Sequence, residues 1–241
     1  MKLNNEVWAF IPARSGSKSI KNKNIVFLKK KPLLVYSLLA ANGAKKIDKI
    51  IFSSDSKKYF NIAKKYSNFF FHKRKKSISL DYSSDFEVFN DFVKNYKFTL
   101  PRFFVHLRPT TPFRDSKILD RVIKNFIKNE KKYSSLRSVS PISNSIYKSV
   151  IIKENNIIFS PIFRSSNLDQ INYPRQKYKK TYIPNGYIDI IKTELILKGL
   201  LHGSRVMCYI NKKFVSDIDN LNDLKIANYY GANKSIKKYD K

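Results

Sequence analysis

Cysteine, histidine and glycine are scarce in this sequence, which has one cysteine, three histidines and six glycines in 241 residues. A lone cysteine excludes an internal disulfide framework and a cysteine-rich zinc site. The histidines match no triad or metal spacing, so we expect them to be ordinary core or surface residues. No apolar run approaches the length of a membrane span, and the N-terminus lacks the architecture of a signal peptide. We therefore expect a cytoplasmic protein with no membrane partner.

Acidic residues are also scarce, with 18 Asp and Glu against 48 Lys and Arg, and the formal net charge is +30. Such a charge is compatible with a basic nucleic-acid-binding protein, whose affinity would fall steeply with salt. However, the excess is mostly lysine, is spread along the whole chain, and accompanies many Ile, Asn, Tyr and Phe residues. A genome-wide codon preference produces this pattern. We favour that explanation and expect no nucleic-acid partner, and nucleic-acid binding stays the competing interpretation.

The residues that are present indicate a packed α/β protein. Hydrophobic residues form 42% of the chain and aromatic residues 14%, which argues against disorder. Short apolar runs alternate with helical patterns, which predicts a doubly wound, mainly parallel sheet with helices on both faces. In such sheets, ligands bind at the carboxyl ends of the strands. The expected strands are 7–11, 50–53, 69–71, 103–107, 136–140, 187–191 and 206–210, and the expected helices are 32–44, 56–66, 85–96, 115–128, 194–201 and 221–230.

The strand–helix rhythm changes after residue 140. Residues 149–152 and 157–159 predict a hairpin, and 168–182 shows little periodicity. We interpret 141–182 as an insertion into an α/β domain. That domain consists of 1–140 and 183–230, and a basic, frayed tail is expected over 231–241.

The most informative stretch is the basic loop over residues 10–24, between the first strand and the first helix. Its four cations are Arg14, Lys18, Lys21 and Lys23. A strand, a small-residue loop and a helix in this order form phosphate cradles from backbone N–H groups and cations. The loop is neither a Walker loop nor a dinucleotide fingerprint, because its only glycine is Gly16. On local spacing alone, a solvated basic loop fits equally well.

Near the other end, Asp217-Ile218-Asp219 precedes the last helix. In an extended chain, residues two apart project to the same face. Two such carboxylates repel each other unless a cation lies between them, and Mg²⁺ with nucleotide phosphates would supply it. The alternative is that Asp219 or Asn220 caps the helix.

Three further loops carry polar residues. Residues 108–114, Arg-Pro-Thr-Thr-Pro-Phe-Arg, are stiffened by two prolines and form either a connector or a ligand-binding loop. The stretches Tyr-Pro-Arg-Gln at 173–176 and Pro-Asn-Gly-Tyr at 184–187 offer side chains that suit a carboxylated, polyhydroxylated ligand. Each signal is weak by itself.

Taken in order, these motifs and the Ser-Ser-Asp turn at 53–55 resemble the acylneuraminate cytidylyltransferase family over about residues 7–230. The family includes the CMP-sialic acid synthetases and relatives that act on legionaminic and pseudaminic acids. The loops at 107–114 and 180–187 look more like the legionaminic-type branch. The synthetases for CMP-3-deoxy-manno-octulosonate usually lack the Gly-Ser-Lys and Lys-Asn portions of the first motif, and they rank lower.

The resemblance implies a nucleotide-diphospho-sugar transferase fold, CTP and a nine-carbon acidic sugar as substrates, Mg²⁺ as cofactor, and a homodimer joined by the insertion. The implied catalytic residues are Arg14, Lys18, Lys23 and Asp217. The implied nucleotide-binding residues are Ala13, Arg14, Ser15, Lys18, Lys23, Asn24, Arg74 and Ser83. The implied sugar-binding residues are Arg108, Thr110, Lys148, Arg175, Gln176 and Asn185, and the implied metal ligands are Asp217 and Asp219.

Two positions of the first loop depart from the family pattern. Ser19 stands where the family usually has glycine, and Ser15 replaces a frequent glycine. The Ser19 departure puts a positive φ at that position in doubt. An inactive relative that serves as an oligomer scaffold therefore stays an alternative.

Overall fold

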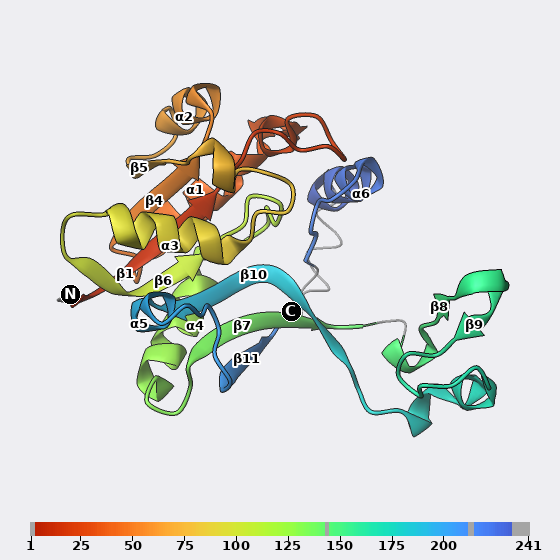
Figure 1. Cartoon of the computed structure of the whole chain (residues 1–241). Helices are drawn as coiled ribbons and strands as arrows, with labels where there is room; N and C mark the ends of the chain where they lie inside the picture. The colour runs from red at the N-terminus through yellow and green to blue at the C-terminus, as the bar shows by residue number, and fades with distance from the viewer. Residues whose placement is uncertain (1–2, 143–144, 212–214, 233–241) are drawn as a thin grey trace.

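The computed structural model describes residues 3–142, 145–211 and 215–232. Within this part of the chain, a seven-stranded sheet of order β11-β7-β10-β6-β1-β4-β5 forms the centre of the molecule (Figure 1). Its strands are β1 (Leu3–Pro12), β4 (Lys49–Ser54), β5 (Phe70–Lys73), β6 (Leu100–His106), β7 (Ser135–Pro141), β10 (Tyr182–Lys192) and β11 (Val206–Ile210).

Apolar clusters pack on both faces of the sheet. One face is covered by α1 (Leu33–Gly43), α2 (Lys57–Lys64) and α4 (Ser116–Asn129). The other face, called here the α3–α5 face, is covered by α3 (Asp85–Asn95) and α5 (Thr193–Leu197). Helices on both faces of a mainly parallel sheet confirm the predicted doubly wound fold.

Side-chain caps fix where three of these helices begin. Ser56 caps α2, and Asp115 caps α4. Ser84 and Glu87 form a capping box at the start of α3. The capping box fixes Asp85 in the first turn of α3, beside the carboxyl ends of the strands.

Two elements differ from their predictions. β10 begins five residues earlier than expected, and it pairs antiparallel with both β6 and β7, with a register shift between Pro184 and Asp189. α5 ends at Leu197 rather than 201. Gly199 has φ +84° and its N–H bonds the Ile196 carbonyl, while the Leu200 N–H bonds the Leu195 carbonyl. This is a Schellman ending, which stops the helix.

Between β7 and β10, residues 145–181 form a projecting arm that extends away from the sheet (Figure 1). The predicted hairpin is confirmed by the antiparallel pairing of β8 (Ile151–Ile152) with β9 (Ile158–Phe159). A 3₁₀ turn at Glu154–Asn156 connects the two strands of the hairpin, and the rest of the arm contains 3₁₀ turns at Ile146–Lys148, Asp169–Asn172 and Arg175–Lys177. The division of the chain into a domain and a dimerising insertion stays a prediction.

A third apolar cluster joins the two ends of the described chain. After β1 the chain forms η1 (Lys23–Ile25) and the small antiparallel ribbon of β2 (Phe27–Leu28) and β3 (Lys31–Pro32). Ile20 and Leu28 pack there with Ile218 and with Ala227 of α6 (Leu221–Ala232). α6 therefore lies against the loop after β1 (Figure 1).

The predicted basic tail falls mostly on residues 233–241, which lie outside the described residues. Within the described ranges, the structure contains no helix with the length and apolar character of a membrane span.

Candidate active site

The loop after β1 is held in place by the ends of neighbouring strands. The Ala13 N–H donates to the carbonyl of Ser53, the residue paired with the end of β1, at 2.8 Å. The backbone N–H and the hydroxyl of Ser15 donate to Asp55 at 2.8 and 2.6 Å. The Asn24 amide donates to a carbonyl within the loop at 2.9 Å. The Ser-Ser-Asp turn after β4 therefore positions the basic loop.

The two departures from the family pattern fit this conformation. The loop takes the left-handed conformation at Gly16, with φ +35°, and at Asn22, with φ +56°. Ser19 is not among the described residues with a positive φ. Because Ser15 donates two hydrogen bonds to Asp55, its side chain contributes to the loop. The loop therefore forms without glycine at either position.

Three cations of the loop are paired with carboxylates. Arg14 and Lys18 both contact Asp81 at 2.8 Å. Lys23 contacts Asp219 at 2.8 Å, across 196 positions of sequence. Hydrogen bonds from Lys18 and Arg14 lower the pKa of Asp81. The cations near the beginning of the chain and a carboxylate near its end thus face one site.

Arg74 and Ser83, expected on the cytidine side, brace the segment between β5 and α3. Arg74 is buried and donates through Nε to the Ile78 carbonyl at 2.7 Å, and burial lowers its pKa. The Ser83 hydroxyl accepts from the Leu80 N–H at 3.0 Å, which shapes the turn that carries Asp81. Their contact with a nucleotide stays a prediction.

The Asp-Ile-Asp triplet lies beside the basic loop. Ile218 is buried in the cluster that contains Ile20, whereas both flanking aspartates are exposed. The two carboxylates therefore project away from the apolar cluster, as an extended chain requires. The Ile218 N–H donates to the Thr110 carbonyl at 2.9 Å, which fixes the triplet against the proline-rich loop.

Helix α6 is capped without the side chain of Asp219. The Asn220 side chain accepts from the N–H groups of Asn222 and Asp223 at 2.9 and 3.0 Å. The Asp223 carboxylate accepts from the N–H groups of Asp219 and Asn220, both at 2.9 Å. The capping alternative is correct for Asn220 and wrong for Asp219, whose carboxylate contacts Lys23 instead.

The two exposed carboxylates of the triplet fit a magnesium ion. Mg²⁺ requires oxygen ligands and is commonly held by one or two carboxylates together with substrate phosphates. Asp217 and Asp219 supply that donor set. Among the described residues, no group of three or more His, Cys, Asp or Glu side chains could form a metal site from protein ligands alone. Phosphate oxygens and water would therefore complete the coordination.

The proline-rich loop is attached to the sheet by Arg114. Its guanidinium donates to the carbonyls of Arg108 and Gly186 at 2.8 Å and to that of Tyr187 at 2.6 Å. Arg114 therefore acts as a structural connector between this loop and β10. Arg108 and Thr110, which were expected at the sugar, lie on the connected loop.

Asn185, also expected at the sugar, is buried in β10. Its amide oxygen accepts from the Ser138 hydroxyl at 2.6 Å, and its nitrogen donates to the Ser140 hydroxyl at 2.8 Å. The next residue, Gly186, has φ +66°, and a Cβ there would lie 2.9 Å from Thr111 Oγ1. Glycine is therefore required at this turn.

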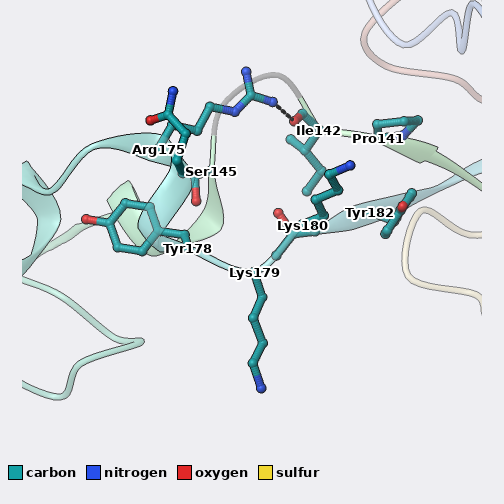
Figure 2. Close-up of a pocket in the computed structure, with 10 residues that line it drawn as sticks. Pro141, Ile142, Ser145, Arg175, Tyr178, Lys179, Lys180 and Tyr182 are labelled. Carbon is teal, nitrogen blue, oxygen red and sulfur yellow. Dashed lines mark hydrogen bonds between the residues drawn. The ribbon is translucent and has the colours of Figure 1, made fainter.

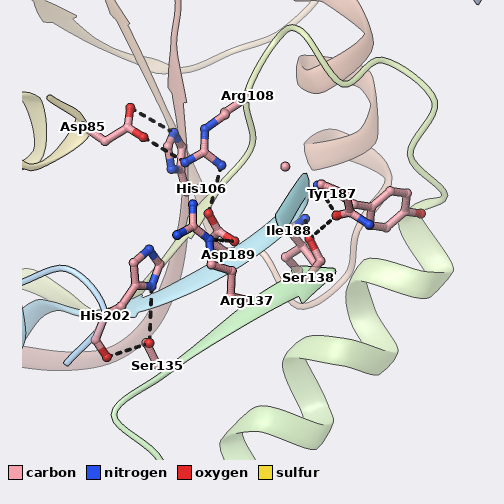
Figure 3. A network of polar contacts seen from close by, with 12 residues as sticks. Asp85, His106, Arg108, Ser135, Arg137, Ser138, Tyr187, Ile188, Asp189 and His202 are labelled. Atoms are coloured by element: carbon pink, nitrogen blue, oxygen red, sulfur yellow. Dashed lines mark hydrogen bonds and ion pairs between the residues drawn. The ribbon is translucent and has the colours of Figure 1, made fainter. Parts of the chain in front are cut away.

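A polar network surrounds Arg108 (Figure 3). The Arg108 guanidinium donates to Asp85 at 2.8 Å and to Asp189 at 2.9 Å. The other carboxylate oxygen of Asp189 lies 3.6 Å from Arg137 Nε. His106 Nε2 lies 4.0 Å from Asp85. These five residues are called the polar network below.

Burial and neighbouring charges set the protonation of the polar network. Burial lowers the pKa of His106 to about 3, so its ring is neutral at pH 7. Burial by itself would raise the pKa of Asp85, but His106 and Arg108 lower it to about 2. Against the effect of burial, Asp85 and Asp189 raise the pKa of Arg108. At neutral pH Arg108 is therefore charged, Asp85 is ionised and His106 is neutral.

Sequence reasoning found only Arg108 of this network. Asp189 lies in the otherwise apolar run Tyr-Ile-Asp-Ile-Ile, and Arg137 lies inside the adjacent strand. A buried charge requires a partner. The sequence therefore did contain a signal for this network: the opposite charges of Arg137 and Asp189 lie in two strands that were expected in the same sheet.

Three residues expected at the sugar, Lys148, Arg175 and Gln176, lie on the projecting arm (Figure 1). Arg175 donates to the Ile142 carbonyl at 3.2 Å. Arg175 and Gln176 line a cavity of about 550 Å³ where the arm joins β7 and β10 (Figure 2). Their contact with a sugar stays a prediction.

Comparisons with known sequences point to one family. A family model described as Cytidylyltransferase matches residues 8–156. The N-acylneuraminate cytidylyltransferase of Escherichia coli is 32% identical over 98% of this chain, and the chain spans 54% of that relative. The pseudaminic acid cytidylyltransferase of Campylobacter jejuni is 28% identical, with 90% of this chain and 92% of that relative covered.

Solved structures share the fold. A CMP:2-keto-3-deoxy-manno-octonic acid synthetase complexed with CTP has a TM-score of 0.66 at 12% identity, covering 94% of this chain and 98% of that chain. A cytidylyltransferase from Leptospira borgpetersenii has a TM-score of 0.61 at 16% identity, covering 97% and 90%. At these identities the likeness concerns the fold alone.

Proposed function

This chain belongs to the cytidylyltransferase family, and from that premise we propose that it joins CTP to a nine-carbon acidic sugar of the sialic or legionaminic type. The products would be the CMP-sugar and pyrophosphate. The observation that carries this proposal is the 2.8 Å contact between Lys23 and Asp219. It brings the cations that would hold phosphates together with the carboxylates that would hold a metal ion.

The relatives support this class of substrate. The sequence relatives at 28–32% identity are named for N-acylneuraminate and pseudaminic acid. The synthetase for 2-keto-3-deoxy-manno-octonic acid shares the fold at only 12% identity. We therefore keep the eight-carbon acid as the alternative substrate.

In the proposed reaction, the anomeric hydroxyl of the sugar attacks the α-phosphorus of CTP in line. A new O–P bond forms, the bond to the β-phosphate oxygen breaks, pyrophosphate leaves, and the hydroxyl proton passes to water. The protein contributes mainly position and charge. Arg14, Lys18 and Lys23 would exchange their carboxylate partners for phosphate oxygens, at a small energetic cost because the carboxylates are 35–71% exposed.

A bound Mg²⁺ would be held by Asp217 and Asp219, and it would neutralise phosphate charge and lower the pKa of the attacking hydroxyl. None of the histidines is assigned as a general base in this proposal, because each has a structural partner. The His72 ring bonds the buried Ser53 hydroxyl at 2.9 Å and Asp91 at 3.0 Å, and the His202 ring lies 3.3 Å from the Ser135 hydroxyl. His106 belongs to the polar network.

The active unit in this proposal is a homodimer in the cytoplasm, the compartment that would supply its substrate CTP. The projecting arm exposes a run of apolar side chains that a second subunit would cover. They include Val150, Ile151, Ile152, Ile157, Ile158 and Ile162, which are 40–74% exposed. Docking of the arm on a partner would place Lys148, Arg175 and Gln176 at a sugar site. Light scattering of the wild type and of Ile152→Lys tests the dimer, and we expect the variant to dissociate.

A coupled pyrophosphate assay tests the reaction. CTP is supplied with sialic, legionaminic, pseudaminic or 3-deoxy-manno-octulosonic acid, with and without Mg²⁺. We expect sugar-dependent pyrophosphate release and a CMP-sugar in the mass spectrum with a nine-carbon acid. Pyrophosphate release with the eight-carbon acid alone would show that this acid, and not a nine-carbon acid, is the substrate. No release from the folded protein would favour the inactive scaffold, and salt-sensitive binding to nucleic acid would favour the competing interpretation.

A further inference from the structure

A row of polar residues crosses the α3–α5 face of the sheet at its ligand-binding edge. Strand pairing places His106 opposite Asp189, and Asp189 opposite Arg137. Directly paired residues of an antiparallel ladder project their side chains to the same face. The preceding row on this face contains the buried residues Phe104 and Ile191. The polar row therefore begins where the apolar cover of the sheet ends.

Arg137 has unused hydrogen-bonding capacity. Its Nε atom is buried and donates no hydrogen bond, and the nearby Asp189 Oδ1 is buried and accepts none. Its Nη groups donate no hydrogen bond to the described residues, and its side chain is 34% exposed. Arg108, by contrast, donates to both of its carboxylate partners. The buried Nε and Oδ1 atoms face each other at 3.6 Å and are closed to a ligand, so the donors that a ligand can reach are the Nη groups of this partly exposed side chain.

Arg137 lies one carboxylate away from the expected sugar site. Asp189 contacts Arg108 with one oxygen and faces Arg137 with the other (Figure 3). A Cβ on Gly186 would lie 3.9 Å from Arg108 Nη1, so the Asn-Gly turn is next to the same guanidinium. A ligand bound against Arg108 and this turn would therefore have Arg137 within reach of its far end.

The charge balance indicates which part of the sugar would lie there. The charges of Arg108 and Arg137 are balanced by Asp85 and Asp189, and His106 is neutral at pH 7. The network thus has no surplus positive charge to hold the sugar carboxylate. The partly exposed Nη donors of Arg137 suit a neutral acceptor, such as the oxygen of an acylamino or hydroxyl substituent.

We propose that Arg137 determines substrate specificity by donating hydrogen bonds to a neutral acylamino or hydroxyl substituent of the acid sugar. Asp189 is the positioning residue, and its buried carboxylate in β10 orients both Arg137 and Arg108. This inference rests on the proposed function and names the part of the sugar that the site recognises. Sites built with hydrogen-bonding groups strongly reject analogues that lack the matching group, because the groups are then left unpaired.

Steady-state kinetics test the proposal with acid sugars that differ only in carrying an acetamido group, a hydroxyl group or hydrogen at one carbon. We expect Arg137→Gln to raise KM for the preferred sugar roughly 10- to 100-fold, as the loss of a hydrogen bond to a charged group would. The kcat and the KM for CTP stay within about threefold, and discrimination between the sugars is largely lost. Asp189→Asn raises the same KM, and the double variant shows less than the summed effect.

Arg102→Gln is the matched control, because Arg102 also pairs with a carboxylate, that of Glu130 at 2.6 Å, and lies on β6, which β10 separates from the strand of Arg137. Its kinetics should match the wild type. Folding is checked by circular dichroism, and if Arg137→Gln does not fold, Arg137→Lys takes its place. That variant keeps the charge but loses the planar fork, and we expect a raised KM for the sugar.

Two outcomes would overturn the proposal, and they are distinguishable. If the wild type transfers cytidylate and folded Arg137 variants keep its KM and its discrimination between sugars, this inference is wrong and the proposed function stands. If the wild type transfers cytidylate to no acid sugar, the proposed function is wrong, and this inference fails with it.

Discussion

Ion pairs of the same side-chain chemistry differ in exposure between the basic loop and the polar network. At the loop, Lys18 is 86% exposed beside Asp81, and Asp219 is 71% exposed although its partner Lys23 is only 13% exposed. Exposed pairs contribute about 0–1 kcal/mol to folding. In the network, Asp189 is fully buried. Removing one partner of a buried pair costs about 3–5 kcal/mol, because a buried charge is then left without compensation.

This difference separates contacts that can be exchanged from contacts that form a scaffold. The cations of the basic loop must release carboxylates before they hold phosphates, and weak solvated pairs permit that. A group that distinguishes one sugar from another must already be oriented, and a buried network provides that orientation. The comparison therefore predicts stability effects in one region and activity effects in the other.

The largest effect should come from removing the centre of the polar network. Arg108→Ala leaves Asp85 and Asp189 without their shared partner, and we expect the free energy of unfolding to fall by about 3–5 kcal/mol. Lys18→Ala, at the exposed pair with Asp81, should cost less than about 1 kcal/mol. Urea denaturation followed by circular dichroism measures both. Equal losses would show that depth does not separate the two kinds of pair.

The next effect should appear in turnover without a matching loss of stability. Lys23→Ala removes a cation from the phosphate site, and we expect cytidylyl transfer to slow about 10²–10³-fold, by analogy with an oxyanion-hole donor. The melting temperature should barely change. Lys21→Ala, in the same loop, is the control and should keep near wild-type turnover. Wild-type turnover in Lys23→Ala would remove this lysine from the mechanism.

Acidification should destabilise the polar network through His106. This ring faces Asp85 from α3, Asp189 from β10, and Arg108, and burial lowers its pKa to about 3. The unfolded chain takes up a proton near pH 6.5 whereas the folded ring does not. Stability is therefore lost as pH falls from about 6.5 toward 3.

At pH 5 this histidine should account for on the order of 2 kcal/mol of the loss. His106→Gln, which does not titrate, should show a shallower decline in unfolding free energy between pH 7.5 and 5. Urea denaturation at both pH values measures the difference. Parallel declines in the variant and the wild type would mean that other groups control acid sensitivity in this range, such as His72 and His202, whose pKa values burial also lowers.

The smallest effect should come from Asp81, which pairs with Arg14 and Lys18 at the surface. Asp81→Asn removes the internal anion that competes with a triphosphate, and we expect CTP to bind about two- to fivefold more tightly, with no change in melting temperature. Isothermal titration with CTP at low salt measures this. Weaker binding would instead assign Asp81 a role in holding the cations in place.

The strand–helix order could be predicted from the sequence because each element carries a local pattern. Apolar runs such as Val7–Ile11 and the helical spacing over 85–96 need no knowledge of the rest of the chain. The direction of β10 could not be predicted in this way. A strand has the same alternation in either direction, and its pairing is decided by where the projecting arm returns to the sheet.

The candidate site likewise contains parts that could be predicted from local sequence patterns and parts that could not. The basic loop and the Asp-Ile-Asp triplet were found from their residue types, and their convergence follows from packing of Ile20 with Ile218, which no local pattern reveals. The polar network was missed because Arg137 and Asp189 are ordinary residues one at a time. Only their burial in paired strands makes them informative.

The docking of α6 on the loop after β1 also determines when the protein becomes competent during synthesis. Residues that emerge first from the ribosome remain without their apolar support until Ile218 and Ala227 have been translated. The nascent chain can build most of its sheet beforehand, as domains tend to fold during elongation. The proposed nucleotide site would therefore be completed after most of the sheet, and we expect a chain that stops shortly before residue 215 to fold much of its core without binding CTP.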